Sequence, residues 1–197
     1  HGLQYSFAGR AEEQARTMAD MELGALVGMA AIYVILAWVF SSYTRPIVVM
    51  AVIPFGVIGA VVGHLLLGFD LSLLTVVGLL GLSGILVNDS IILVLTVDER
   101  ISAGEETIHA IVAGSQDRLR AVMLTSLTTI GGLTPLLFET SLQAQFLIPM
   151  AITMIFGLAF ATILVLLVIP ALIAIQLDFH NMYQRRRDRA GLRQRIW

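Results

Sequence analysis

The sequence Gly78-Leu-Leu-Gly-Leu-Ser-Gly-Ile-Leu-Val-Asn-Asp-Ser-Ile-Ile-Leu-Val94 lies inside an apolar run from Leu71 to Val97. That run has about 27 residues, and a helix of about 20 residues crosses the hydrocarbon core of a bilayer. Asp89 is the only Asp, Glu, Lys or Arg in the five long apolar runs of this chain. A charge at the bilayer centre costs at least about 2.5–3.5 kcal/mol on insertion scales. We therefore predict an ion- or proton-responsive carboxylate inside a transmembrane helix, with a structural polar contact between helices as the alternative.

Small and polar residues accompany this carboxylate. On a wheel of 100° per residue, Gly78, Gly81, Asn88 and Asp89 fall within an arc of about 100°. Glycines on such a face let another helix approach closely. The sequence thus predicts that Gly78 and Gly81 pack against a neighbouring helix, beside the polar pair Asn88 and Asp89.

The composition is that of an integral membrane protein. The 197 residues are 57% hydrophobic and 13% charged, with a mean hydropathy of +0.88, whereas soluble domains average about 25% charged residues. The absence of cysteine excludes disulfides and thiolate metal sites. Apolar runs of this length favour helices over barrel strands of about 10 residues. We predict an all-α membrane domain over residues 23–178, with spans at 23–40, 46–69, 71–97, 121–138 and 146–177.

The segments outside the spans are polar. Residues 1–22, with a strand end over 5–9, are predicted to be the end of an outer domain that runs as a helix into the membrane. The first residue is His1, which suggests a piece of a longer chain, or a processed or engineered product. Residues 105–116 are predicted to be an amphipathic helix on the inner membrane face, with a plain loop as the alternative. Residues 179–197 form a basic tail.

Arginine placement predicts the topology. Every basic side chain is arginine, and ten of the twelve fall on one side of the membrane if the first span runs inward. Cytoplasmic segments carry the excess of basic residues. We therefore expect a cytoplasmic C-terminus, near anionic lipid, and an outer N-terminus. Nucleic-acid binding is not indicated, because no aromatic or fold signal accompanies the charge.

Several residues carry local predictions. Pro54 should kink the second span, and Asp70 is a candidate cap for the third. His64 is expected to be interfacial or hydrogen-bonded rather than a metal ligand. Thr125 and Thr129 share a helix face, so they either line a polar interior or bond to their own helix carbonyls.

Signatures of covalent chemistry are missing from the sequence. There is no nucleotide-binding glycine loop, no Ser/His/Asp set and no pair of carboxylates. No cluster of Met, His or Cys indicates a metal site. We expect no enzyme activity, no cofactor and no metal.

Taken together, these residues resemble the resistance-nodulation-division (RND) efflux transporters, over the last five membrane helices of the second half. The resemblance covers nearly the whole chain and rests on several ordered segments: Ser42-Tyr43 and Pro46, Val52–Ala60, Gly63-His64-Leu65, Gly68–Ser72, Gly81–Ser90, Arg118–Leu127 and Pro135-Leu136.

The resemblance implies a twelve-helix, proton-driven antiporter of the bacterial inner membrane that exports drugs or other small hydrophobic compounds. It also implies a homotrimer with periplasmic porter domains, a periplasmic adaptor and an outer-membrane channel. In the drug-efflux branch, a lysine on the tenth helix pairs with two aspartates on the fourth, and a threonine on the eleventh completes the proton relay. Here Asn88 takes the lysine's place and Thr125 the threonine's. The resemblance thus implies a relay of Asp89, Asn88 and Thr125 without the usual lysine, completed by the missing N-terminal portion.

Two other functions remain open. The five helices are alternatively a stand-alone membrane scaffold or assembly subunit with a structural carboxylate. The chain is also compatible with a protein- or lipid-export branch of the same superfamily.

Overall fold

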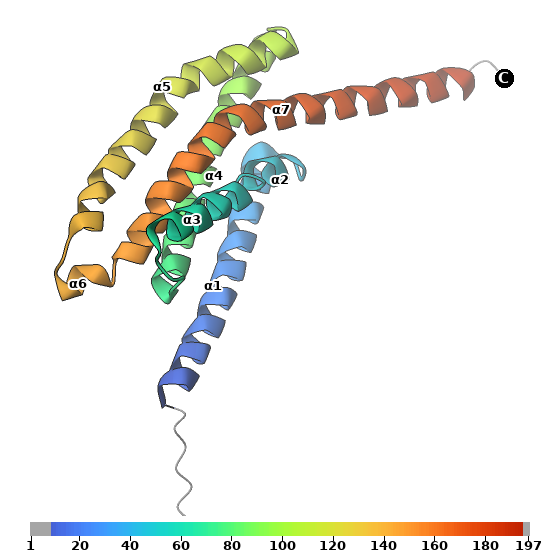
Figure 1. Ribbon diagram of the computed structural model, residues 1–197. Helices are drawn as coiled ribbons and strands as arrows, with labels where there is room; N and C mark the ends of the chain where they lie inside the picture. Colours follow the sequence, from blue (N-terminus) through green and yellow to red (C-terminus); the bar gives the residue numbers. More distant parts are fainter. Residues whose placement is uncertain (1–8, 195–197) are drawn as a thin grey trace, which may run out of the picture. The chain divides into compact units, whose positions relative to one another are not determined.

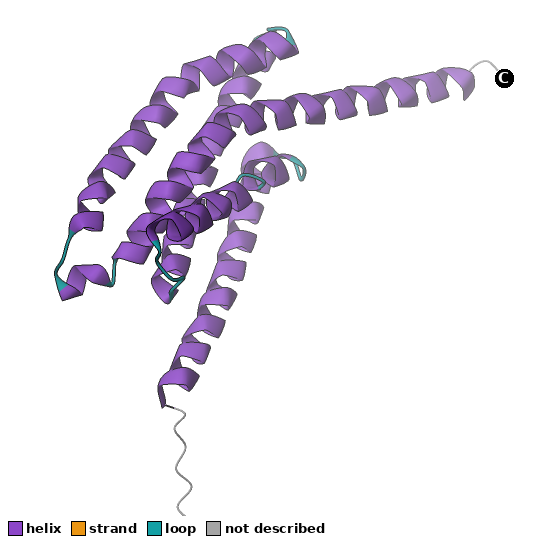
Figure 2. Cartoon of the chain, in the orientation of Figure 1, coloured by secondary structure: helices purple, strands orange, loops and turns teal. Residues whose placement is uncertain are grey.

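The computed structural model describes residues 9–194, without the side chains of Arg10, Ala11, Gln14 and residues 177–194. All regular secondary structure in the described residues is helical (Figure 2). The expected strand end lies almost wholly outside the described residues, and so do the side chains of the basic tail. The chain forms two compact units, His1–Ile47 and Val48–Trp197.

The first unit is built on one long helix, α1 (Gly9–Phe40). The helix continues without a break from the polar segment into the apolar span, as predicted. It is followed by a turn in which Ser41 has a positive φ of 47°. The Tyr33 hydroxyl donates a hydrogen bond to the carbonyl oxygen of Tyr43 at 3.1 Å, which holds this turn against the end of α1.

The second predicted span is interrupted, as expected from its proline. It consists of α2 (Arg45–Met50) and α3 (Ile53–Leu67), separated by Ala51 and Val52. Pro54 lacks an N–H group, and its ring clashes with the preceding helical turn. The predicted kink is therefore confirmed as a break just before this proline. Helix α3 ends at Gly68, whose φ of 69° is left-handed and suits glycine.

Two details differ from the sequence-based expectations. Helix α4 (Leu73–Ser102) has Ser72 as its N-cap residue rather than Asp70, because the Thr75 hydroxyl accepts the Ser72 backbone N–H at 3.0 Å. The separate helix expected over 105–116 does not form; instead, α5 (Thr107–Leu133) runs unbroken from this segment into the fourth span. No proline or glycine lies between 116 and 121, and Arg118 and Arg120 are good helix formers.

The last helix organises the second unit. After a short 3₁₀ turn, η1 (Thr134–Phe138), and α6 (Leu142–Gln145), α7 (Ile148–Gln194) packs against α3, α4 and α5. Figure 1 shows α7 changing direction along its length, and Pro170 lies inside it. Two turns, α3–α4 and α5–α7, meet at one end of this unit, which we call the α3–α4 end; the opposite end is the α4–α5 end.

Glycines allow the helices of the second unit to approach closely. A Cβ built on Gly59 of α3 would lie 2.6 Å from Phe160 Cβ and 2.7 Å from the carbonyl oxygen of Phe156. A Cβ on Gly114 of α5 would lie 2.9 Å from Val97 Cγ2 of α4. The core between these helices is aliphatic, and its fully buried side chains include Leu82, Leu86, Leu93, Ile152, Leu158 and Ile169.

The fold class is confirmed: the described residues contain five helices long and apolar enough to cross a membrane. Their ranges are Ala15–Phe40, Arg45–Leu67, Leu73–Ser102, Thr107–Phe138 and Ile148–Gln176.

Candidate functional site

The carboxylate of Asp89 lies on the buried face of α4. Its residue is 8% exposed, and the same face contains Gly78, Leu82 and Leu86. Next to it, Ser90 is fully buried, and its hydroxyl donates to the carbonyl oxygen of Leu86 at 2.7 Å. The polar segment of α4 is thus turned into the packed bundle.

The Asp89 carboxylate has no hydrogen bond or ion pair within the described part of the chain. This distinguishes it from the hydroxyls of the same helix, Ser83, Ser90 and Thr96, which all bond to a carbonyl one turn back. Buried polar groups normally have partners, because an unpaired one carries its full desolvation cost. Within the described bundle, no hydrogen bond or ion pair therefore explains the Asp89 carboxylate as a stabilising contact.

Asn88 and Thr125 lie on exposed surface of this chain. Consecutive residues of a helix are separated by 100°, so the face that buries Asp89 turns Asn88 away. The Thr125 hydroxyl lies 3.1 Å from the carbonyl oxygen of Ala121 and 3.0 Å from that of Val122, both on its own helix. No hydrogen bond among the described residues joins Asp89, Asn88 and Thr125.

The two glycines singled out on α4 have different surroundings. A Cβ on Gly78 would lie 3.0 Å from Thr153 Cβ and 3.1 Å from the carbonyl oxygen of Met150, both on α7. A Cβ on Gly81 would meet only Met154 Cε, at 3.9 Å. Close approach of α7 thus occurs at Gly78, whereas Gly81 is exposed.

A hydroxyl pair links α5 to α7. Ser126 Oγ and Thr162 Oγ1 lie 2.7 Å apart, and both residues are less than 5% exposed. The Thr162 hydroxyl also lies 2.7 Å from the carbonyl oxygen of Leu158. Since Ser126 follows Thr125 directly, this contact is part of what turns Thr125 to the exposed side.

We expect the coupling free energy between Ser126 and Thr162 to be about 0.6 kcal/mol, the average for hydrogen bonds between membrane helices. A double-mutant cycle with Ser126→Ala and Thr162→Val, measured by unfolding the full-length protein in detergent, checks this value. The cycle of Ser126→Ala with Thr128→Val is the control, because Thr128 bonds only to its own helix. Equal coupling free energies in the two cycles would contradict a direct hydrogen bond between Ser126 and Thr162.

Sequence analysis missed the position of Arg118. Its Nε donates to Thr96 Oγ1 at 2.8 Å, which places a guanidinium between α5 and α4. Thr96 lies seven residues after Asp89, which is about 10 Å along the same face of α4. Arg118 also precedes Thr125 by seven residues, so a search for a cation two turns from the threonine would have found it.

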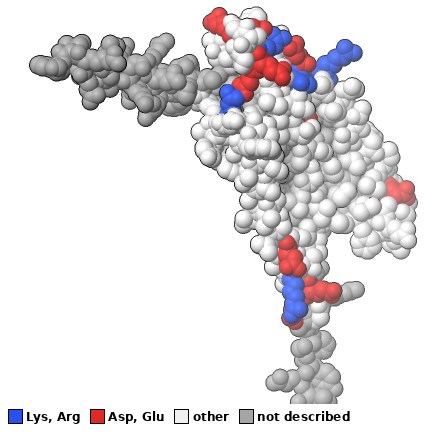
Figure 3. All heavy atoms as spheres, turned by 180° about the vertical axis from the view of Figure 1, so that it is seen from behind, with Lys and Arg blue, Asp and Glu red and all other residues white. Residues whose placement is uncertain are grey.

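Ion pairs close the α4–α5 end. Arg100 bonds to Glu105 Oε1 at 2.7 Å and to Asp117 Oδ2 at 2.5 Å, and His109 Nδ1 lies 3.5 Å from Glu105 Oε2. Figure 3 shows charged side chains gathered over one end of the second unit, with uncharged atoms covering most of the rest of the same face. These ion pairs join α4 and α5 at this end.

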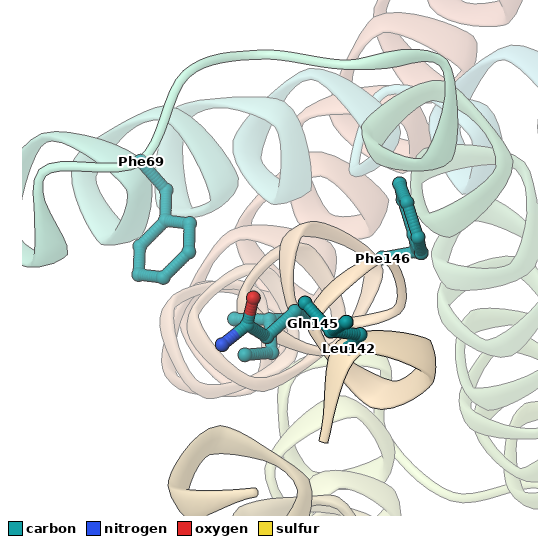
Figure 4. A pocket seen from close by; sticks show the side chains of 5 residues that line it. Phe69, Leu142, Gln145 and Phe146 are labelled. Atoms are coloured by element: carbon teal, nitrogen blue, oxygen red, sulfur yellow. The ribbon is translucent and has the colours of Figure 1, made fainter. Parts of the chain in front are cut away.

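A pocket lies at the α3–α4 end, between the turn after α3 and the start of α7. Its volume is about 520 Å³, and it is lined by Phe69, Leu142, Gln145, Phe146 and Ile148. Figure 4 shows Phe69 and Phe146 on opposite sides, with Gln145 and Leu142 between them. The lining has no charged side chain, so the pocket offers no group that could exchange a proton.

Comparisons with known proteins point to one family. The sequence model described as "AcrB/AcrD/AcrF family" matches residues 1–176. The chain is 31% identical over 174 residues to the swarming motility protein SwrC of Bacillus subtilis strain 168, which covers 88% of this chain and 16% of SwrC. It is 33% identical over 129 residues to the nickel and cobalt resistance protein CnrA of Cupriavidus metallidurans, which covers 66% of this chain and 12% of CnrA.

Further matches agree with this result. The multidrug resistance protein MdtC of Enterobacter sp. strain 638 is 28% identical over 166 residues, covering 84% of this chain and 16% of MdtC. The crystal structure of a heavy metal efflux pump superposes with a TM-score of 0.72 at 27% identity, covering 84% of this chain and 16% of the pump. The chain thus spans less than a fifth of the length of these relatives.

Proposed function

This chain belongs to the AcrB/AcrD/AcrF family of RND transporters, and from that premise we propose that it is the C-terminal membrane portion of a proton-driven efflux pump. One observation supports the proposal above all: Asp89 is buried in an apolar helix, and within the described residues its carboxylate has no hydrogen bond or ion pair that would give it a structural role. In the proposed mechanism, Asp89 takes up and releases the coupling proton. Asn88 and Thr125 lie on exposed faces of α4 and α5 and there meet helices of the remaining transporter.

The charge balance of the proposed relay differs from that of the lysine-containing branch. Asparagine at position 88 supplies an amide but no positive charge. Arg118 contacts the Asp89 face of α4 through Thr96, about 10 Å along the helix axis from Asp89. We assign to Arg118 the electrostatic stabilisation of the ionised carboxylate, because an opposite charge favours the ionised form.

The test is the reaction of the full-length transporter, in membranes, with dicyclohexylcarbodiimide. This apolar reagent adds to protonated carboxyl groups, and mass spectrometry of peptides locates the product. We expect modification of Asp89 that rises as the pH falls, along a single titration curve. Glu99, exposed on the same helix, is the control. Reaction at Asp89 that is absent, or equal at all pH values, would contradict a proton-carrying role.

We propose small hydrophobic compounds, including drugs, as the exported substrates, because the relative MdtC is named a multidrug resistance protein. Export of a metal cation is the second candidate, because CnrA is named for nickel and cobalt resistance and the superposed structure is a heavy metal efflux pump. Efflux of ethidium and of Ni²⁺ from cells that produce the full-length protein distinguishes the two candidates.

We further propose that the pump is an inner-membrane homotrimer with a cytoplasmic C-terminus, acting with a periplasmic adaptor and an outer-membrane channel. The asymmetric distribution of arginine supports the orientation. An antibody against the tail, applied to native membranes, should detect a band several times heavier than the 21.4 kDa of these residues. A band at that mass would favour the stand-alone scaffold instead.

A further inference from the structure

A buried histidine links α3 to α4. His64 and Thr75 are each 3% exposed. His64 Nδ1 lies 3.0 Å from the carbonyl oxygen of Ala60, and His64 Nε2 lies 3.1 Å from Thr75 Oγ1. The hydrogen-bonded interpretation of this histidine is therefore confirmed, and the relay described above makes no use of it.

The hydrogen-bond network assigns the tautomer of His64. A carbonyl oxygen only accepts, so Nδ1 carries the proton that is donated to Ala60. Thr75 Oγ1 already accepts the Ser72 backbone N–H at 3.0 Å. In the Nδ1–H tautomer Nε2 is an acceptor, so the Thr75 hydroxyl donates its own proton to Nε2, and both ring nitrogens are hydrogen-bonded.

The surroundings of His64 in the described bundle are apolar. Apart from His64, no titratable side chain occurs in α3, in residues 73–88 of α4 or in residues 148–176 of α7. The bond to Thr75 is therefore a polar contact within a largely apolar interface between α3 and α4.

We propose that His64 is a positioning residue for α4: through Thr75 it fixes the rotation of the helix that carries Asp89. This inference rests on the proposed function of Asp89. Thr75 occupies the first turn of α4, and Asp89 follows 14 residues later, about 21 Å along the axis. Fourteen residues turn the helix to within about 40° of four full turns, so the two side chains share one face.

The contact acts together with the packing of α7. Gly78 of α4 lies against Thr153 of α7, one turn from Thr75. Helix packing at glycine permits close approach but carries little directional preference. The bond between His64 and Thr75 is directional, and it alone among the described hydrogen bonds joins the side chains of α3 and α4.

The first part of the test is nitrogen NMR of the full-length transporter, labelled with ¹⁵N-histidine, in liposomes. The His64 signals are identified by their loss in His64→Gln. We expect a protonated Nδ1 and an unprotonated Nε2 whose resonance moves in Thr75→Val and returns in Thr75→Ser. An Nε2–H tautomer, a doubly protonated ring or an unchanged Nε2 resonance in Thr75→Val would overturn the inference.

The second part measures the pH at which half of Asp89 reacts with dicyclohexylcarbodiimide. We expect Thr75→Val to shift this pH by about one unit, a tenfold change in proton affinity, and Thr75→Ser to restore it. Thr128→Val on α5 is the control and should leave it unchanged. If half of Asp89 reacts at the same pH in Thr75→Val as in the wild type, the positioning role of His64 is overturned, even when the reaction of Asp89 depends on pH. If Asp89 does not react in the wild type, the proposed function is overturned instead. The NMR experiment distinguishes this failure from a failure of the inference, because it tests the bond between His64 and Thr75 independently of Asp89.

Discussion

Replacing Asp89 by asparagine in the full-length transporter should reduce proton-coupled efflux by about a hundredfold, the usual loss when a positioned proton-transfer group is removed. Asparagine has nearly the same shape but cannot carry the proton. The folded protein should not be weakened, because the carboxylate has no hydrogen bond in the described bundle. Asparagine also avoids the cost of a buried charge, at least about 2.5–3.5 kcal/mol on insertion scales. Activity and stability should therefore change independently.

This prediction is checked by ethidium efflux driven by an imposed pH gradient, together with the amount of transporter in the membrane. Glu99→Gln is the control, because Glu99 is an exposed carboxylate of the same helix. Normal efflux with an unchanged pH dependence in Asp89→Asn would show that the carboxylate is not part of the coupling. Equal losses in both variants would point to a general effect of charge on α4.

The second large effect is expected at the contact between α3 and α7. Gly59→Ala should destabilise the protein by about 2 kcal/mol, within the range for overpacked cores. The added Cβ would lie 2.6 Å from Phe160 Cβ and 2.7 Å from the carbonyl oxygen of Phe156. These atoms belong to the backbone or are attached directly to it, so relief requires that the helices separate.

Gly84→Ala is the matched control for this substitution. Gly84 lies inside α4, and among the described residues no atom beyond its own stretch of helix lies within 4 Å of a Cβ built there. Alanine is favoured over glycine in a helix by about 0.5–1 kcal/mol, and both variants receive this gain. The difference between their unfolding free energies in detergent therefore isolates the steric clash. Equal stabilities would show that α3 and α7 do not approach as closely as the structure has them.

Much of the fold was predictable because it depends on local properties of the chain. Five apolar runs are too long for anything but membrane helices, and five such helices are present in the described residues. Pro54 predicted the break between α2 and α3, since the missing N–H acts within one turn. The prediction of a separate helix over 105–116 is wrong, because the polar residues between 116 and 121 do not break a helix.

The pairing of side chains from different helices could not be predicted in the same way. The family resemblance predicts a role for Thr125, yet the neighbouring Ser126 is the residue that bonds across to α7. His64 was expected to be hydrogen-bonded, but its partner Thr75 belongs to another helix. A helical wheel gives the angle between two residues of one helix, and it does not give the direction in which that helix faces its neighbours.

The contrast is clearest at Asp89 and Asn88. Composition and run length are enough to predict that the apolar run 71–97 crosses the membrane with Asp89 as its only charged residue, because both are local properties of the chain. The wheel placed both residues in one arc of about 100°, next to Gly78 and Gly81. Tertiary packing divides that arc: Asp89 and Gly78 are buried, Gly78 against α7, whereas Asn88 and Gly81 are exposed. The rotation of α4 follows from contacts between residues far apart in the chain, and only the tertiary structure contains them.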